Sequence, residues 1–140
     1  AVLVGLPAKR EVGLRIWVAA ALIIMVQSAV VLAVVPLWVE AAYALMGLFS
    51  LHLYQVDKQA AADGRWRIRE VSLHLADLGF GIIGGLIGQH ILNHKTGKPG
   101  FVVVTGLVAA LHMAILTAVI AGLLSWPIVW AFLAGLLHLA

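Results

Sequence analysis

Charged residues in this 140-residue chain are confined to a few short clusters, and long apolar segments separate them. Every lysine and arginine lies within residues 9–15, 58–69 or 95–98. Only 11% of the residues are charged and 64% are hydrophobic, whereas a soluble domain carries about 25% charged residues. A membrane-spanning helix needs about 20 apolar residues. The sequence therefore predicts an all-α integral membrane protein, with residues 1–140 forming a single membrane domain.

The apolar segments predict about four transmembrane helices and a re-entrant helical hairpin. Pro36 ends the first crossing because proline lacks a backbone donor. Ser125, Trp126 and Pro127 are expected to form a turn with an aromatic anchor. The expected order is residues 14–35 and 37–56 as the first two crossings, 57–69 as a basic cytoplasmic loop, 70–93 as a re-entrant hairpin or third crossing, 101–124 as a crossing, and 128–140 as a final apolar helix.

Residues 70–93 decide the topology. This segment is long enough to span, but it contains five glycines, each of which weakens a helix by about 1 kcal/mol. Asp77 near its centre is costly in a membrane helix. Basic clusters flank the segment, and basic loops mark the cytoplasmic side. We favour a hairpin in which residues 70–78 descend, 79–85 turn and 86–93 return. One straight crossing, which would place residues 94–98 outside, is the alternative.

The chain ends bear on orientation. Lys9, Arg10 and Arg15 predict a cytoplasmic N-terminus. The sequence begins with Ala1 and stops in the apolar run GLLHLA, so we expect that residue 1 is not the translational start.

The stretch from about Pro36 to Phe101 resembles an uncharacterised family of small bacterial integral membrane proteins, some of which carry a cold-shock domain. The resemblance follows PLWV (36–39), DK (57–58), GRWRI (64–68), LHL (73–75) and HKT (94–96), with Lys98 and Phe101. A basic residue normally precedes the HK pair in that family, and Asn93 stands there in this chain. The resemblance implies a location in the bacterial cytoplasmic membrane and a polar cluster at one interface, without implying an activity.

The two internal basic clusters supply a candidate site at one membrane face. We expect Arg67 or Lys95 to pair with Asp57 or Glu70, and Glu70 to begin a helix, where the dipole favours a carboxylate. The site has three readings: a structural clasp, a binding site for an anionic lipid phosphate, or an acid–base pair of His94 with Glu70 or Asp57. The clasp is the reading we favour. The candidate residues are Asp57, Lys58, Arg65, Trp66, Arg67, Glu70, His94, Lys95, Thr96 and Lys98.

A second set of polar residues lies within the apolar segments: His74, Asp77 and His112. An intramembrane carboxylate indicates a functional site by default, and the expected partner of Asp77 is His74 or His112. Pairs of histidines at helical spacing are compatible with metal or haem ligands. Buried membrane histidines also hydrogen-bond between helices, so we expect no metal or haem cofactor. A bound phospholipid is compatible with the basic clusters.

These observations favour a non-catalytic accessory or structural subunit of a larger membrane complex. The chain is small and rich in glycine and alanine, which suits helix packing in lipid, and it carries no recognisable catalytic motif. One alternative is a protein that binds or modifies anionic lipids, and a lower alternative is a haem- or metal-binding electron carrier. The expected partners are the lipid bilayer and other membrane subunits. Nucleic acid is not expected, because no basic stripe is broad enough.

Overall fold

The computed structural model describes residues 13–139, which are helical and contain no strand. Lys9, Arg10 and Ala140, which belong to the expectations above, lie outside the described residues. The elements are α1 (Leu14–Val31), α2 (Leu37–Ala62), α3 (Glu70–Ala76), η1 (Asp77–Gly81), α4 (Ile82–Leu92), α5 (Pro99–Ile120) and α6 (Trp126–Leu139).

Four stretches are long and apolar enough to cross a membrane: Leu14–Val31, Leu37–Ala62, Glu70–Leu92 and Pro99–Ile120. This is the architecture of a multi-pass, all-α membrane protein, as the composition predicts. The shorter apolar helix α6 follows them.

Several helix boundaries differ from the predicted ones. Helix α1 ends at Val31, before a turn in which Ala33 has a positive φ of 56°. Helix α2 continues to Ala62, so Asp57 and Lys58 lie on a helix and not in a loop; alanine favours this extension. Pro99 begins α5, because proline suits the first turn of a helix.

The turn predicted at Ser125–Pro127 is only partly correct. Residues 121–125 form the connection, with Gly122 at a φ of 74°, and α6 begins at Trp126. Pro127 is the second residue of α6, where its missing N–H costs no hydrogen bond.

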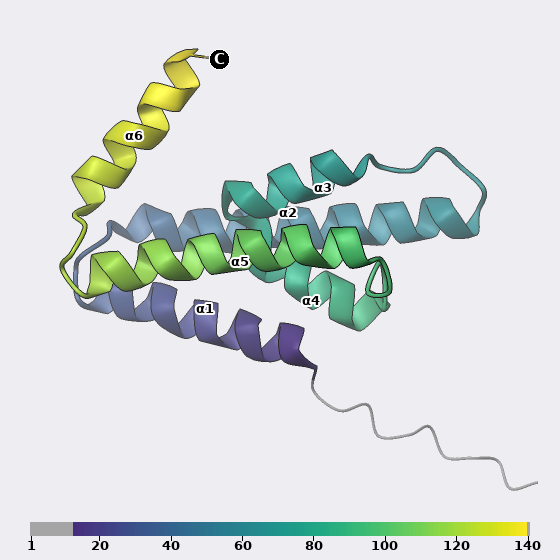
Figure 1. Cartoon of the computed structure of the whole chain (residues 1–140), viewed down its shortest axis with the longest axis horizontal. Coiled ribbons are helices and arrows are strands. Elements are labelled where there is room, and N and C mark those ends of the chain that lie inside the picture. Colours follow the sequence, from purple (N-terminus) through teal and green to yellow (C-terminus); the bar gives the residue numbers. More distant parts are fainter. Residues whose placement is uncertain (1–12, 140) are drawn as a thin grey trace, which may run out of the picture.

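The chain reverses direction within residues 70–92. Gly79 and Phe80 have non-helical backbone angles, and the φ of Phe80 is 75°. Residues 82–85, which were expected to belong to the turn, are helical. Figure 1 shows α3 running away from one end of the bundle and α4 running back toward that end. The start of α3 and the end of α4 therefore lie near the C-terminal end of α2 and the start of α5.

Helix α2 is the central element, and η1, α3 and α4 pack along it while α1 covers α4. Gly47 and Gly84 allow α2 and α4 to approach closely, because a Cβ on Gly84 would overlap the Gly47 backbone. Small residues at helix contacts are the usual packing device in lipid. Apolar side chains that include Leu22, Val39 and Leu116 fill the rest of the interior.

Helix α6 leaves the bundle (Figure 1). None of the side chains within its described residues Trp126–Leu139 is buried. Its first turns contact α2 through Trp38, whose ring lies 5.6 Å from that of Trp126 and 5.2 Å from that of Trp130. Trp38 and Trp126 belong to the first turns of α2 and α6, and Figure 1 shows those turns at the end of the bundle opposite the start of α3 and the end of α4.

Candidate functional site: a charged clasp and a buried polar chain

Polar residues follow one face of α2 over most of its length. Together with Gly47, they recur at alternating intervals of four and three residues, the spacing that places side chains on one face of a helix. Those facing the interior are Tyr43, Ser50, Tyr54 and Asp57, all buried, and Gly47 interrupts the series. This face meets η1 and α4, so α2 supplies one side of two separate polar clusters.

Asp57 is the centre of the first cluster and is fully buried. Its Oδ2 accepts hydrogen bonds from His94 at 2.6 Å and from Arg67 at 3.1 Å, and Nζ of Lys95 lies 3.3 Å away. Its Oδ1 accepts the backbone N–H of Ile68 at 3.0 Å. One carboxylate thus joins the end of α2 to the 63–69 loop and to the segment after α4.

Glu70 is the second carboxylate of this cluster and begins α3, as predicted. Nζ of Lys95 lies 3.5 Å from it, and Lys98 forms a closer ion pair with it. Lys95 therefore bridges Asp57 and Glu70, and its ammonium also lies 5.1 Å from the ring centre of Phe101. We expected Arg67 or Lys95 to pair with Asp57 or Glu70; Arg67 pairs with Asp57, and Lys95 pairs with both carboxylates. We call Asp57, Arg67, Glu70, His94, Lys95 and Lys98 the clasp.

The other four predicted residues lie outside the clasp. Lys58 donates a hydrogen bond to the carbonyl of Leu92 at the end of α4. Thr96 donates to the Asn93 side chain at 3.2 Å. Trp66 is 99% exposed. Arg65 pairs with Asp63 at 3.0 Å on the surface.

The Asp63–Arg65 pair is the exposed counterpart of the clasp. Hydrogen bonds from Gln59 and Arg65 lower the pKa of the Asp63 carboxyl. Exposed ion pairs contribute about 0–1 kcal/mol, so this pair serves as a natural control for the buried one.

Asp77 is the centre of the second cluster, and its predicted partners are wrong. It accepts hydrogen bonds from Ser50 Oγ at 2.5 Å and Tyr54 OH at 2.8 Å, and not from His74 or His112. It is fully buried where α3 meets η1. The expectation failed because the reversal at Gly79 and Phe80 turns the carboxyl toward α2.

Gln89 of α4 extends this cluster toward the basic end of the bundle. Its Nε2 lies 3.1 Å from both Tyr54 OH and Thr105 Oγ1, to which it donates. Its Oε1 accepts a hydrogen bond from Arg15 Nε at 3.1 Å. A continuous chain of hydrogen bonds therefore runs from Asp77 through Tyr54 and Gln89 to Arg15.

The remaining histidines are separate from one another. His112 lies 2.6 Å from Tyr43 OH through Nδ1 and 3.1 Å from the Leu78 carbonyl through Nε2. His74 stacks near Phe101, with ring centres 4.2 Å apart. Within residues 13–139, no group of three His, Cys, Asp or Glu side chains is placed to hold a metal ion.

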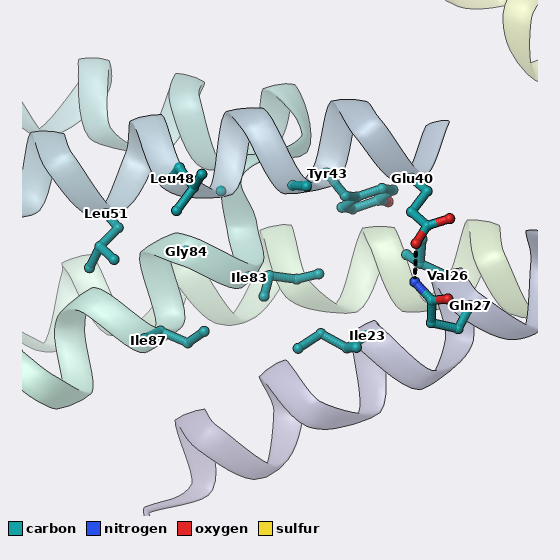
Figure 2. A pocket seen from close by; sticks show the side chains of 12 residues that line it. Ile23, Val26, Gln27, Glu40, Tyr43, Leu48, Leu51, Ile83, Gly84 and Ile87 are labelled. Atoms are coloured by element: carbon teal, nitrogen blue, oxygen red, sulfur yellow. Dashed lines mark hydrogen bonds between the residues drawn. The ribbon is translucent and has the colours of Figure 1, made fainter. Parts of the chain in front are cut away.

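A largely apolar cavity of about 280 Å³ lies between α1, α2 and α4. Figure 2 shows Ile23, Leu51 and Ile87 around it, and a hydrogen bond of 2.6 Å between Gln27 and Glu40 at one end. Most of the side chains that line it are apolar, and Glu40 is the one charged residue among those described.

The sequence reading missed Ser50, Tyr54 and Gln89. The alternating spacing of Tyr43, Ser50, Tyr54 and Asp57 along α2 was a usable signal, because it marks one continuous helix face. No comparable signal identified Gln89, since the face of α4 that it occupies depends on where the chain reverses.

The fold and these clusters define a class: a small multi-pass helical membrane protein with a charged clasp at one end and a polar chain in its interior. Residues 47–101 match the family described as "Protein of unknown function (DUF1294)". This agrees with the resemblance seen in the sequence. The matched region runs from the middle of α2 to the start of α5, so it includes the whole clasp, the reversal, Asp77 and Gln89. Neither the curated proteins nor the solved structures contain a significant match.

Proposed function

We propose that this chain is a multi-pass protein of the bacterial cytoplasmic membrane whose basic end binds anionic lipid headgroups at the cytoplasmic face. The observation that carries the proposal is the gathering of charge at one end of the bundle. The lysines and arginines of residues 13–139 all belong to elements that begin or end there: Arg15, Lys58, Arg65, Arg67, Arg69, Lys95 and Lys98. Among residues 13–139, three carboxylates accompany them: Asp57, Asp63 and Glu70.

Part of this charge serves the clasp, and the remainder faces outward. Arg67 and Lys98 keep about half or more of their side chains exposed while contacting a carboxylate, and Arg69 is exposed. Trp66 projects from the same loop and is exposed, and tryptophan is enriched at membrane–water interfaces. Each basic residue near an anionic surface contributes about 1 kcal/mol. The clasp positions these cations, and lipid phosphates balance the excess.

In this proposal α3, η1 and α4 form a re-entrant hairpin with both ends at the cytoplasmic face. Ion pairs between Glu70 and the segment that follows α4 support it, because they join the two ends of the hairpin. At the reversal, Phe80 packs against Tyr43 and His112, whereas Gly79 is exposed. Phe80 thus has part of the protein cover that irregular backbone at membrane depth requires. The N-terminus of α1 then lies at the cytoplasmic face as well.

Native mass spectrometry in mild detergent tests lipid binding. The protein is purified, exposed to phosphatidylglycerol or phosphatidylcholine, and compared with the double variant Arg69→Gln/Lys98→Gln. We expect wild type to retain phosphatidylglycerol preferentially and the double variant to lose that preference. A Gln55→Ala variant, changed at an exposed position on α2, is the control. Equal retention of the two lipids by wild type would refute the proposal.

A second function, that of an accessory subunit in a larger membrane complex, is favoured by α6. This helix presents Ile128, Phe132 and Leu137 without burying them, so lipid or another protein must cover it. Wild-type protein purified from native membranes in mild detergent should be part of a larger assembly. A variant that lacks residues 126–140 should purify without the other subunits. A wild-type monomer would contradict this second function.

A further inference from the structure

Asp77 has no role in the proposed lipid site. It lies in the interior of the bundle, separate from the clasp, and its side chain is fully buried. Among the residues that the structure describes, no lysine or arginine forms an ion pair with it. Its partners are the two hydroxyl groups of Ser50 and Tyr54.

A carboxylate in this setting has two hydrogen-bond donors and no counter-ion. Burying an ionised carboxylate costs several kcal/mol even after relaxation, and hydroxyl donors offset only part of that cost. A proton removes the charge and retains the hydrogen bonds. We propose that Asp77 is a proton-binding site inside the membrane domain, exchanging its proton with the basic end of the bundle through Tyr54.

The surrounding groups accommodate both forms of the carboxyl. In the ionised form, Ser50 and Tyr54 both donate to it. In the neutral form, the proton on Oδ1 is donated to Ser50 Oγ, whose own hydroxyl turns to the carbonyl of Met46, four residues earlier. Tyr54 continues to donate to Oδ2. Neither state leaves a buried donor without an acceptor.

The elements packed around Asp77 contribute few other titratable groups. Helix α4 places Gly85 against the carboxyl, where a Cβ would overlap it. Helix α5 contributes His112, which contacts the carbonyl of Leu78, the residue after Asp77. Helix α3 contributes His74, one turn earlier, whose buried Nδ1 has no hydrogen-bond partner within residues 13–139.

The direction of exchange follows from the hydrogen bonds of Tyr54. Its hydroxyl contacts Asp77 on one side and Gln89 on the other, and Gln89 leads to Thr105 and Arg15. In the transfer, the Tyr54 O–H bond breaks as an O–H bond forms on Oδ2 of Asp77, and half a turn of the carboxyl then brings this proton to Ser50 Oγ. The phenol oxygen then takes a proton from a hydronium ion on the Gln89 side. The net change is one proton gained by Asp77.

Infrared spectroscopy of the full chain in lipid bilayers tests this inference. Wild type should show the C=O band of a protonated carboxyl at neutral pH, and the band should shift in D2O. Asp77→Asn should lose the band, and Asp63→Asn, changed at an exposed carboxyl, should retain it. Ser50→Ala should retain the band at a shifted frequency, because the carboxyl O–H loses the hydroxyl oxygen that accepts its hydrogen bond.

Tyr54→Phe tests the route. The band should remain in this variant, and its shift after transfer to D2O should develop more slowly than in wild type. Absence of the band from wild type at every pH, or its persistence in Asp77→Asn, would overturn the proton-binding site. Exchange as fast in Tyr54→Phe as in wild type would overturn the route through Tyr54. Either result leaves the lipid proposal unaffected.

Discussion

At the scale of single residues, two fully buried aspartates have different environments. Asp57 is surrounded by Arg67, His94 and Lys95, and Asp77 by two hydroxyl groups. The first is held ionised by its counter-charges, while the second has none. Burial alone therefore does not decide the role of a carboxylate, because its partners determine whether charge is tolerated.

The clasp predicts a large difference between two Asp→Asn variants. Asp57→Asn removes the charge that Arg67 and Lys95 share and weakens the contact with His94, so we expect a loss of about 3 kcal/mol in the free energy of unfolding. Asp63→Asn breaks an exposed pair and should cost less than about 1 kcal/mol. Unfolding by SDS titration in mixed micelles measures both. Equal stability of the two variants would show that the clasp does not hold the fold together.

At the scale of elements, the contact between α2 and α4 depends on two glycines in different ways. A Cβ on Gly84 would overlap the Gly47 backbone, whereas a Cβ on Gly47 would meet Gly84 N at an ordinary 3.5 Å. We expect Gly84→Ala to destabilise by about 1–3 kcal/mol. Gly47→Ala should be close to neutral.

Gly106→Ala is the control for helix propensity, because it lies on α5 with open space around it. It should stabilise slightly, since alanine favours a helix over glycine. The same SDS titration ranks the three variants. An equal effect of Gly84→Ala and Gly47→Ala would mean that the two helices approach each other differently.

The end of α4 supplies a second prediction at this scale. Asn93 is the C-cap and has a left-handed backbone with a φ of 48°. Asparagine and glycine adopt this conformation more readily than other residues, at a difference of about 1–2 kcal/mol. Asn93→Gly should therefore keep wild-type stability and Asn93→Ala should lose about 1 kcal/mol. The departure from the family's basic residue at this position fits the cap. Thermal denaturation in detergent measures the difference, and identical midpoints would argue against it.

At the scale of the whole molecule, the bundle has two unlike ends. The clasp joins the end of α2 to the start of α3 and the segment after α4, and Trp38 contacts Trp126 and Trp130 where α2 and α6 begin. Figure 1 shows these two groups of helix ends at opposite ends of the bundle. This asymmetry follows the distribution expected of a cytoplasmic and an opposite face. Chain reversal at η1 places both internal basic clusters at the same end.

Cysteine labelling tests that arrangement in this cysteine-free chain. Trp66→Cys and Gly97→Cys should react with a membrane-impermeant reagent only after the cytoplasmic face is opened. Leu123→Cys, in the exposed connection between α5 and α6, should react from the outside of intact cells. Labelling of positions 66 and 97 from opposite sides of the membrane would mean that residues 70–92 cross it once.

The sequence by itself determined the class of the protein and the composition of the clasp. Apolar segments of spanning length require helices in lipid, because each backbone polar group there must be paired within its own segment. The two basic clusters lie close to the ends of those segments, so their pairing with Asp57 and Glu70 followed from topology. The sequence did not determine where α2 ends. The apolar pattern stops near residue 56, whereas the helix continues through alanines 60–62.

Only the tertiary structure decided the interior. Asp77 was identified from its cost in lipid, but its partners Ser50 and Tyr54 precede it by 27 and 23 residues, and the angle of the reversal sets which face it meets. Gln89 reaches Tyr54 because α4 packs against α2 through Gly47 and Gly84. Hydrophobic patterning specifies that a helix is buried in the membrane, whereas hydrogen bonds between helices depend on the rotation and depth of each helix. Close packing fixes those two quantities once the chain has folded.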